Sequence, residues 1–581
     1  MAVEKLIVDH IDTWTTALQT RSTAGRGSSG KIDLYGIKKL RELILELAVR
    51  GKLVPQDPND EPASVLLERI AAEKAELVKQ GKIKKPKPLP EISEEEKPFE
   101  LPGGWEWARF ETALDFSGGS QPPKSFFIEE PKEGYVQLIQ IRDLGEYPQP
   151  VYVPINKVTK LCTSEDILIG RYGASVGKVF WGKNGAYNVA LIKIDNSYNL
   201  YNNQFLFWLL KSPLGQSLFS GISRSAQDGF NKSDIAEKLL PVLSEKEQSK
   251  IVVRINDLMS LCDQLEQHSL SSLDAHQQLV ETLLTTLTDS QNADELAESW
   301  ARISEHFDTL FTTEASIDAL KQTILQLAVM GKLVPQDPSD EPASELLKRI
   351  AQEKAQLVKD GKMKKQKSLP PISCENMPFN LPENWVWCRF GNIVKSLSNG
   401  LYKSESHYSN DGIISLRMYN IQNGIIDFAD VRRVKVTELE KYKYILEEGD
   451  LLINRVNSKE LVGKTAIIPE INEPLLFESM NMRACLFKEI ISSHYINTLF
   501  QSEYIKKELS LYAKEAISQA SINQQQITEL LIPLPPSIEQ KNIVDKVNLL
   551  LSLLDQVKYC MDKIKNTQVH LAEALTDAAI N

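Results

Sequence analysis

A chain of 581 residues with 42% hydrophobic and 25% charged residues is too long for one hydrophobic core and too apolar for a disordered protein. No stretch is apolar over the roughly 18 residues that a membrane helix needs, so we expect a multidomain cytoplasmic protein without a membrane partner. The net charge of −11 argues against nucleic acid, but the acids are concentrated in residues 245–314, whereas 101–241 and 381–536 are nearly balanced. Six cysteines without C-x-x-C spacing and seven scattered histidines indicate buried reduced thiols and no protein-bound metal.

The first motif in chain order occurs twice. LAVRGKLVPQDPNDEPAS, from Leu47 to Ser64, returns as LAVMGKLVPQDPSDEPAS from Leu327 to Ser344. A shift of about 280 residues aligns 40–110 with 320–390 at roughly two-thirds identity. Further on, GFNKSDIAEKLLPVLSEKEQSKIV from Gly229 aligns with SINQQQITELLIPLPPSIEQKNIV from Ser521. The chain is therefore two tandem copies, with Ser22 to Gly30 as a flexible Gly/Ser-rich insertion in the first.

After each copy of this phrase comes a predicted amphipathic helix, ASVLLERIAAEKAELV or ASELLKRIAQEKAQLV, which ends at a Gly. Lysine-rich segments follow at Lys79 to Pro90 and Lys359 to Pro370. Such runs are either DNA-binding patches or, more commonly, solvated linkers.

Two blocks with different sequences follow, at 111–228 and 391–520. Each opens after a similar phrase, LPGGWEWARF or LPENWVWCRF, and alternates apolar and polar residues between Gly, Asn and Pro turns. This pattern predicts mainly β structure with a few helices. The four tryptophans of the opening phrases are expected in the core, because they recur in blocks that otherwise differ; they are Trp105, Trp107, Trp385 and Trp387.

A long helix is predicted after each block. Apolar residues recur at helical spacing from Ile251 to Leu279 and from Ile543 to Ile564, over about 40 residues in each case. Antiparallel pairing of the two helices is the simplest way to bury both apolar stripes. The alternative is that each helix packs on its own domain.

The order of these motifs resembles the specificity subunit of Type I restriction-modification systems, in the longer subgroup with an N-terminal helical extension. The similarity rests on LPxxWxW, LIQIRDLG and LRMYNIQNG, DILIGRYGASVGK and DLLINRVNSKELVGK, and IPLPPSIEQKNIV before a long helix. It implies an α+β fold: two β-rich target recognition domains separated by long antiparallel coiled-coil helices, with pseudo-two-fold symmetry. The expected segments are an N-terminal helical region (1–100), the first recognition domain (101–243), a central helical region (244–380), the second recognition domain (381–536) and a C-terminal long helix (537–581).

The resemblance also implies a function. Each recognition domain would read one half of a bipartite asymmetric target in double-stranded DNA. Two methyltransferase subunits and restriction subunits would dock on the chain. The chain itself would bind no cofactor, and the assembled adenine N6-methyltransferase and ATP-dependent endonuclease would use S-adenosylmethionine, ATP and Mg²⁺ through its other subunits.

Arg and Lys recognise guanine in the major groove and Asn and Gln recognise adenine, while other polar groups hold phosphates. Each candidate residue could instead be an ordinary surface residue or a hydrogen-bonding residue at a strand end. The candidates in the first block are Gln140, Arg142, Arg171, Lys178, Asn231 and Lys232, and those in the second are Arg417, Tyr419, Asn420, Arg455, Lys464, Asn523 and Gln524.

Two other classes of function remain as alternatives. A coiled-coil scaffold without DNA binding would suit the acidic balance, but it gives no reason for the β-rich blocks to diverge. A self-contained restriction or modification enzyme is disfavoured, because GASVGKV and SKELVGKTA lack the glycine and hydroxyl spacing of a phosphate-binding loop and no methyltransferase motif is present.

Overall fold

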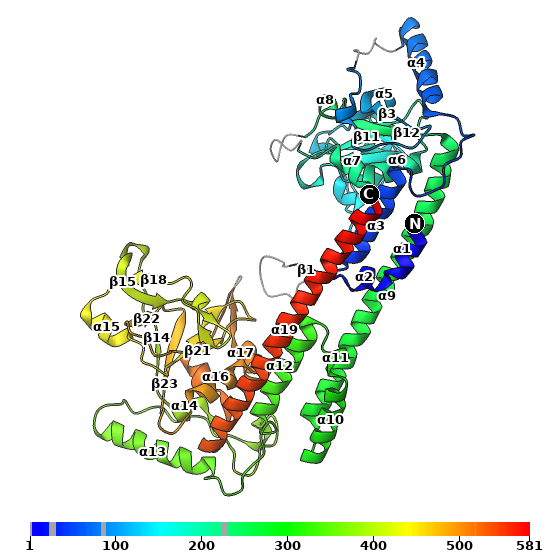
Figure 1. Cartoon of the computed structure of the whole chain (residues 1–581). Coiled ribbons are helices and arrows are strands. Elements are labelled where there is room, and N and C mark those ends of the chain that lie inside the picture. The colour runs from blue at the N-terminus through cyan, green and yellow to red at the C-terminus, as the bar shows by residue number, and fades with distance from the viewer. Residues whose placement is uncertain (1–2, 22–30, 83–88, 222–228, 517–518, 581) are drawn as a thin grey trace. The chain divides into compact units, whose positions relative to one another are not determined.

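The computed structural model describes residues 3–21, 31–82, 89–221, 229–516 and 519–580, and it separates into two compact units (Figure 1). Unit 1 is made of Met1–Thr20, Ile32–Leu270 and Lys565–Asn581, and unit 2 of Arg21–Lys31 and Ser271–Ile564. The predicted flexible insertion, 22–30, lies outside the described residues.

Helices form most of the segments that the two sequence copies share. Where the apolar spacing predicts two helices of about 40 residues, the structure has α9 with 45 residues and α19 with 44. Within the described residues, no helix combines the length and the apolar character that a membrane crossing demands. The helices are α1 (Val3–Asp9), α2 (Ile11–Thr16), α3 (Tyr35–Val49), α4 (Ala63–Lys79), α5 (Phe110–Ala113), α6 (Asn203–Lys211), α7 (Pro213–Ser217), α8 (Lys232–Ile235), α9 (Glu245–Asp289), α10 (Ala293–Glu305), α11 (Phe307–Leu310), α12 (Glu314–Val329), α13 (Ala343–Lys359), α14 (Phe390–Ile393), α15 (Glu438–Tyr444), α16 (Ser493–Gln501), α17 (Glu503–Tyr512), α18 (Gln524–Glu529) and α19 (Ser537–Ile580).

Each unit carries one β-rich domain, which we name head 1 (residues 101–243, unit 1) and head 2 (residues 381–536, unit 2). Their strands and short helices confirm the prediction of mainly β structure. Head 1 contains β3 (Glu106–Arg109), β4 (Asp115–Gly118), β5 (Tyr135–Ile139), β6 (Tyr152–Pro154), β7 (Leu161–Cys162), β8 (Ile167–Gly170), β9 (Val179–Trp181), β10 (Gly185–Tyr187), β11 (Leu191–Asp195) and β12 (Leu239–Val242). Head 2 contains β13 (Val386–Arg389), β14 (Val394–Asn399), β15 (Tyr408–Leu416), β16 (Ile421–Gln422), β17 (Ile425–Ile426), β18 (Arg432–Val434), β19 (Leu451–Asn454), β20 (Val456–Asn457), β21 (Thr465–Ile467), β22 (Leu475–Phe477), β23 (Asn481–Leu486), β24 (Lys514–Ala516), β25 (Gln519–Ser521) and β26 (Leu531–Leu534); β1 (Gln19–Arg21) and β2 (Lys31–Asp33) precede both heads.

The two heads share the order of their first sheet and of three strands in their second; head 1 adds β7 to the second sheet, and head 2 adds the small sheets β16-β17 and β20-β25-β24. Head 1 has sheets ordered β4-β11-β8-β9 and β6-β5-β10-β7, and head 2 has β14-β23-β19-β21 and β18-β15-β22. In each head the second sheet contains one parallel pair, β5 with β10 or β15 with β22. Because the sequences of these blocks differ strongly, the common topology follows from where apolar residues and turns fall rather than from residue identity.

A strand pair formed by its first and last segments closes each head. In head 1, β3 runs antiparallel to β12 and places Trp107 opposite Pro241. In head 2, β13 and β26 place Trp387 opposite Pro533 in the same way. The prediction that the tryptophans of the opening phrases are core residues is confirmed, since all four are between 6% and 9% exposed.

The expectation of six buried thiols is only partly correct. Cys162, Cys262 and Cys388 are buried and Cys485 is half-buried, but Cys374 and Cys560 are exposed. Cys374 lies in the loop before head 2, and Cys560 lies on the face of α19 that also exposes Tyr559. Helical spacing of the neighbouring apolar residues, not the thiol itself, decides this orientation.

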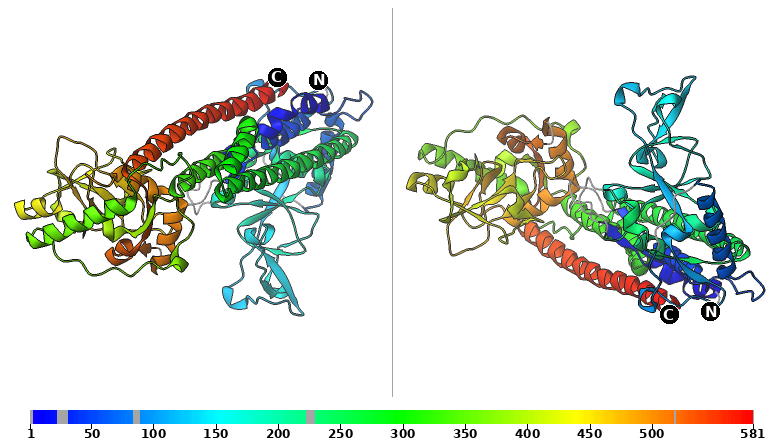
Figure 2. Two further views of the ribbon diagram at one scale, coloured as in Figure 1. Left: turned by 90° about the horizontal axis from the view of Figure 1, so that it is seen from below. Right: turned by 90° about the horizontal axis from the view of Figure 1, so that it is seen from above.

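In unit 1, α3 contacts both long helices. Its Arg41 pairs with Asp263 and Glu266 of α9, with N–O distances of 2.6 Å to each. Its Tyr35 hydroxyl donates a hydrogen bond of 2.6 Å to Glu573 of α19. The last turns of α19 therefore lie beside α3, as Figures 1 and 2 show.

In unit 2, α12 has the corresponding position. Its Lys321 lies 2.5 Å from Asp555 of α19, and its Glu314 lies 2.5 Å from Lys558. Buried residues of α9, α12 and α19 belong to one hydrophobic cluster, which includes Leu284, Ile317 and Val547. A short helix thus joins both long helices in each unit.

Candidate nucleic-acid interface

Both heads place a predicted arginine directly after a fully buried strand. Arg171 follows β8, and Arg455 follows β19. The two strands occupy the same position in sheets of the same order. Burial of the whole strand fixes the backbone at this point, so each arginine starts from a rigid base.

Around Arg171, three predicted residues of head 1 meet at the beginning of α8. The guanidinium Nε donates to the carbonyl of Phe230 at 3.0 Å, and Nη2 donates to Oδ1 of Asn231 at 2.9 Å. It also lies 5.3 Å from the ring centre of Tyr172. These contacts orient the fork of Arg171 while leaving the side chain partly exposed.

Lys232, the first residue of α8, faces two carboxylates of the same head. Its Nζ lies 2.9 Å from Asp115 and 3.2 Å from Glu111. Burial alone would lower the pKa of Lys232, but Asp115 and Glu111 raise it above the ordinary value. Lys232 therefore stays protonated and is already paired with two carboxylates. This favours a role in fixing the start of α8 over a direct contact with DNA.

Head 2 builds the matching corner at α18. Nη1 of Arg455 donates to the carbonyl of Ser479 at 3.1 Å, and no acceptor for its buried Nε is present among the described residues. Asn523 accepts a hydrogen bond from the backbone of Gln526 at 3.0 Å and caps α18. Gln524 donates to Asn399 at 3.2 Å. Arg455 therefore keeps one N–H without a partner among the described residues, in contrast to the fully engaged Nε of Arg171.

The two predicted lysines after these strands differ in accessibility. Lys178 of head 1 is exposed. Lys464 of head 2 is half-buried, and burial lowers its pKa. Lys178 is therefore the more accessible of the two for a phosphate contact.

A second predicted corner follows the parallel strand of each head. Gln140, after β5, and Arg417, after β15, each begin a short 3₁₀ turn. The backbone N–H of Gln140 donates to Asp143 at 2.8 Å, and that of Arg417 donates to Asn420 at 2.8 Å. The turns are therefore built alike from different residues.

The side chains on these turns have different surroundings. Arg142 of head 1 is exposed. Arg417 of head 2 is held by Glu478, at 2.5 Å from its Nε, and lies over the ring of Tyr408. Tyr419 is half-buried beside it. The two heads thus offer different polar groups at one structural position.

The structure corrects the expectation for Asn420. This residue is 1% exposed, and its amide donates to the carbonyls of Asp427 at 2.9 Å and Asp430 at 2.8 Å. Its Oδ1 already accepts from Arg417. Asn420 therefore holds the turn and presents no free group to a base.

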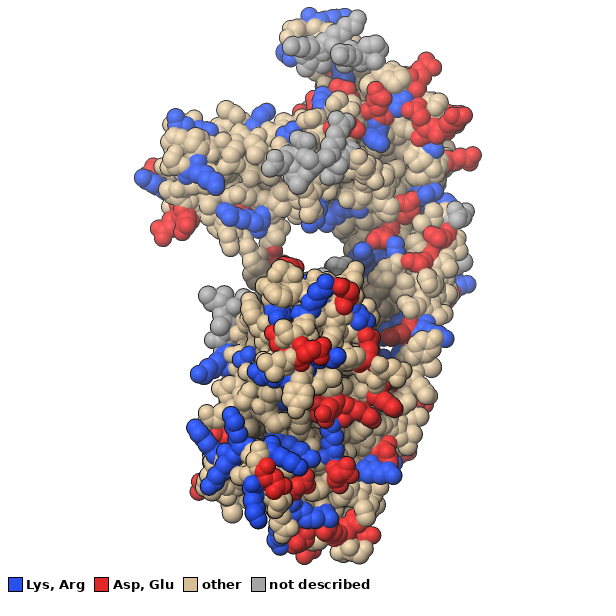
Figure 3. All heavy atoms as spheres, turned by 90° about the vertical axis from the view of Figure 1, so that its left-hand side faces the viewer, with Lys and Arg blue, Asp and Glu red and all other residues tan. Residues whose placement is uncertain are grey.

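The candidates drawn from the sequence do not include one basic segment of head 2. It spans β18 and α15, and α15 includes Tyr442, which is 84% exposed. Tyr402, which is 81% exposed, precedes Lys403, the ion-pair partner of Glu440 in α15. Figure 3 views the side of the molecule on which Figure 1 places these elements, and Lys and Arg gather there. The sequence signal that could have indicated this segment is the local density of Arg and Lys in RRVKV and EKYKY. The basic residues concerned are Arg432, Arg433, Lys435, Lys441 and Lys443.

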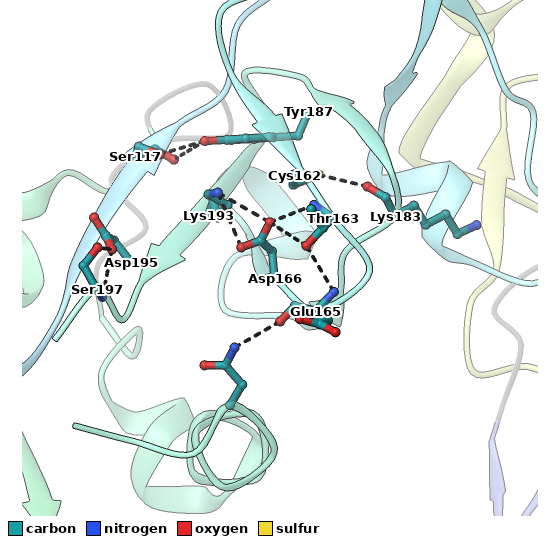
Figure 4. Close-up of polar contacts among 11 residues, drawn as sticks. Ser117, Cys162, Thr163, Glu165, Asp166, Lys183, Tyr187, Lys193, Asp195 and Ser197 are labelled. Carbon is teal, nitrogen blue, oxygen red and sulfur yellow. Dashed lines mark hydrogen bonds and ion pairs between the residues drawn. The ribbon is translucent and has the colours of Figure 1, made fainter. Parts of the chain in front are cut away.

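Besides the Lys232 corner, head 1 brings Lys193 and Asp166 together, and this pair has a structural explanation. Asp166 accepts hydrogen bonds from the backbone and hydroxyl of Thr163 at 2.7 and 3.2 Å and pairs with Lys193 at 3.4 Å (Figure 4). These contacts fix the turn that leads into β8. Among the residues that the structure describes, no three His, Cys, Asp or Glu side chains are grouped as metal ligands.

A family model described as the Type I restriction modification DNA specificity domain matches residues 110–275 and 382–558. The chain belongs to this Type I specificity family. The EcoAI specificity subunit of Escherichia coli is 51% identical, and the EcoEI specificity subunit of Escherichia coli 47% identical, each over the full length of both chains. A solved chain of a type I R-M system is 15% identical, with a TM-score of 0.47, over 83% of this chain and 99% of that one. The expected family is therefore confirmed, and a scaffold outside it is not favoured.

Proposed function

We propose that this chain is the DNA-reading subunit of a Type I restriction-modification complex and that each head reads one half of a bipartite, asymmetric target. The observation that carries the proposal is that one strand topology is present twice with different polar side chains at matching corners. A symmetric reader would repeat those side chains as faithfully as it repeats the fold.

The matching corners supply groups that discriminate bases. Gln140 in head 1 corresponds to Arg417 in head 2, and the exposed Arg142 corresponds to Tyr419. A glutamine amide pairs with adenine and a guanidinium with guanine in the major groove. The heads would therefore recognise different half-sites with one framework.

The shared helices would set the distance between the half-sites and receive the other subunits. We propose that α9 and α19 form an antiparallel coiled coil with pseudo-two-fold symmetry, on which two methyltransferase subunits dock and to which restriction subunits are added. Support comes from the equivalent roles of α3 in unit 1 and α12 in unit 2, each of which contacts both long helices. A surface that is repeated in this way suits two copies of one partner.

Under this proposal the chain contributes recognition and the other subunits contribute the chemistry. S-adenosylmethionine, ATP and Mg²⁺ would bind to those subunits.

An exchange of heads tests the proposal. The full chain is expressed with its methyltransferase subunit, and methylated adenines are mapped across a genome by long-read sequencing. We expect a split motif with a fixed gap. Replacing residues 381–536 by the corresponding segment of the EcoEI relative should change one half of the motif and leave the other half and the gap intact. A motif that changes in both halves, or the absence of any motif from a folded complex, would contradict the two-headed reader.

A further inference from the structure

A lysine-rich loop outside the recognition heads is not used by the proposed function. It comprises residues 359–369, between the end of α13 and the start of head 2, and we name it the lysine loop. It holds five lysines and one aspartate. All five lysines are exposed, and no carboxylate lies within ion-pairing distance of them among the described residues. The lysines are Lys359, Lys362, Lys364, Lys365 and Lys367.

The lysine loop starts from a fixed point. Its first turn closes α13, since the backbone N–H groups of Lys362 and Met363 donate to the carbonyl of Leu357 at 2.9 and 3.1 Å. Gly361 provides the left-handed conformation that this helix end needs, with φ of 69°. The direction in which the loop leaves the helix is therefore set.

The middle and the end of the loop are anchored as well. Lys354, on α13, donates to Oε1 of Gln366 at 3.0 Å and to the carbonyl of Gly391 in head 2 at 2.7 Å. At the end of the loop, Arg389 of β13 donates to the carbonyl of Pro370 at 3.3 Å. The loop is thus anchored against head 2 at its middle and its end and is not a free tether.

Helix α13 holds this arrangement to the rest of unit 2. Its residues Ala343, Leu346 and Ile350 are at most 1% exposed and belong to the hydrophobic cluster that also contains Phe390 of α14. Figure 1 shows α13 extending from this anchored end. In Figure 3 both Lys or Arg and Asp or Glu side chains are exposed at the lower end of unit 2.

The chemistry of the loop fits a polyanion and not a base sequence. Five unpaired positive charges stand within nine residues of a chain whose net charge is −11. The loop contains no Asn or Arg, and the Oε1 of its one amide, Gln366, already accepts a hydrogen bond from Lys354. Lysine ammonium groups bind phosphates as point charges and release counterions on binding.

We propose that the lysine loop binds DNA phosphates beside the half-site that head 2 reads and adds affinity that does not depend on sequence. This inference rests on the proposed function. The first sequence copy has the same lysine positions at Lys79, Lys82, Lys84, Lys85 and Lys87, although residues 83–88 lie outside the described residues. Sequence specificity would then come from the heads, and the loop would add affinity for any DNA duplex.

The test removes three charges without touching a head. The variant Lys364→Gln/Lys365→Gln/Lys367→Gln is compared with Lys5→Gln/Lys38→Gln/Lys348→Gln, which removes three exposed lysines outside both heads and both long helices. Both are assembled as full chains with the methyltransferase subunit. The probes are a 60-base-pair duplex carrying the motif found by methylation mapping and a duplex of the same length without it, each titrated between about 50 and 200 mM salt.

We expect the loop variant to bind both duplexes roughly tenfold more weakly than the control at about 150 mM salt, by the same factor for each. The slope of log affinity against log salt should fall by about two to three, because each lost phosphate contact removes about 0.9. The methylated motif should not change.

Three outcomes overturn the inference. One is a salt slope equal to that of the control variant. Another is a loss of binding confined to the duplex with the motif, which would make the loop a sequence reader. The third is a loss of methyltransferase assembly with unchanged DNA binding, which would assign the lysines to an acidic protein surface. A wild-type complex that yields no split motif would instead refute the proposed function itself.

Discussion

The doubled sequence phrase is held by a single buried carboxylate in each unit. In unit 2, Glu539 at the start of α19 accepts hydrogen bonds from the indole of Trp385 at 2.8 Å and from Gln336 at 2.6 Å. Gln336 lies in the repeated LVPQDP, and Trp385 opens head 2. In unit 1, Glu247 accepts in the same way from Trp105 at 2.8 Å. One residue therefore joins the phrase, the head and the long helix, which explains why the phrase must occur twice.

Substitution of Glu539 tests this joint. Glu539→Ala leaves the indole N–H of Trp385 without an acceptor and opens a cavity, and we expect it to lower the free energy of unfolding by about 2–4 kcal/mol. Glu539→Gln keeps an acceptor and should cost less than about 1 kcal/mol at neutral pH. Thermal unfolding of the full chain measures both variants.

The pH dependence of the free energy of unfolding is the control for this prediction. Burial raises the pKa of Glu539 above its ordinary value of 4.5, although Trp385 and Gln336 donate to it. The folded state therefore holds the proton more tightly than the unfolded chain, so ionisation costs stability as pH rises above about 4.5. Relative to Glu539→Gln, the wild type should lose stability from acid to neutral pH, and Glu247→Gln should show the same sign. A difference that does not change with pH would contradict a buried charged carboxylate.

At this scale the sequence predicts residue types but not their partners. The motifs around Arg171, Arg455, Gln140 and Arg417 singled them out as candidates, and the structure places each of them directly after a strand. That Glu478 would hold Arg417 could not be foreseen, because 61 residues separate the two and only the sheet brings them together. The buried position of Asn420 was hidden for the same reason.

Among the shared helical elements, the two copies differ where α3 or α12 meets the segment before it. Gly36, at the start of α3, lies against the backbone of α2, and a Cβ at this position would be 2.4 Å from the carbonyl oxygen of Trp14. The matching residue of α12 is Ser316, whose hydroxyl donates to the carbonyl of Thr313 at 2.8 Å. In unit 1 the position against α2 therefore has no room for a side chain, whereas the matching position of unit 2 holds a serine that caps α12.

Gly36→Ala should destabilise unit 1 by about 1–3 kcal/mol, because a backbone carbonyl has to move to admit the methyl group. Gly103→Ala, in the same unit, meets no atom within 4 Å and is the matched control, with little expected change. Hydrogen exchange resolved by segment would measure both. Equal protection of α2 and α3 in the two variants would show that the close approach carries no cost.

Most of the element order could be predicted, since helical spacing and alternation are local signals. The long helices begin at Glu245 and Ser537, close to where the apolar spacing starts. The pairing of β3 with β12 across about 130 residues has no local signal. Neither has the parallel pair in each head, because parallel strands are joined by long connections.

On the scale of the whole molecule, neither unit is a continuous half of the chain. Unit 1 includes Lys565–Asn581 of the C-terminal helix, and unit 2 includes the preceding part of that helix. The domain boundaries expected from the sequence follow the repeat and treat α19 as one segment, and no local pattern marks Ile564 as the point of division.

Truncation after Ile564 should therefore act on unit 1. The deletion removes Glu573, the partner of Tyr35, and the carbonyl of Ile580, which accepts from Lys52. We expect lower hydrogen-exchange protection in α3 of unit 1 and unchanged protection in head 2, although the deleted residues follow head 2 in the sequence. The reverse pattern would show that α19 is stabilised as one piece within unit 2. Tyr35→Phe, which loses only the hydrogen bond to Glu573, is the milder control.

The hydrogen bond between Tyr35 and Glu573 also bears on the order in which the two units can be completed during synthesis. Its two partners are separated by 538 residues, so the second leaves the ribosome long after the first, by roughly 30–110 s at about 5–20 residues per second. Every segment of unit 2 has been synthesised once Ile564 is added, whereas unit 1 still waits for the final turns of α19. The domain that the ribosome starts first is the one that it finishes last.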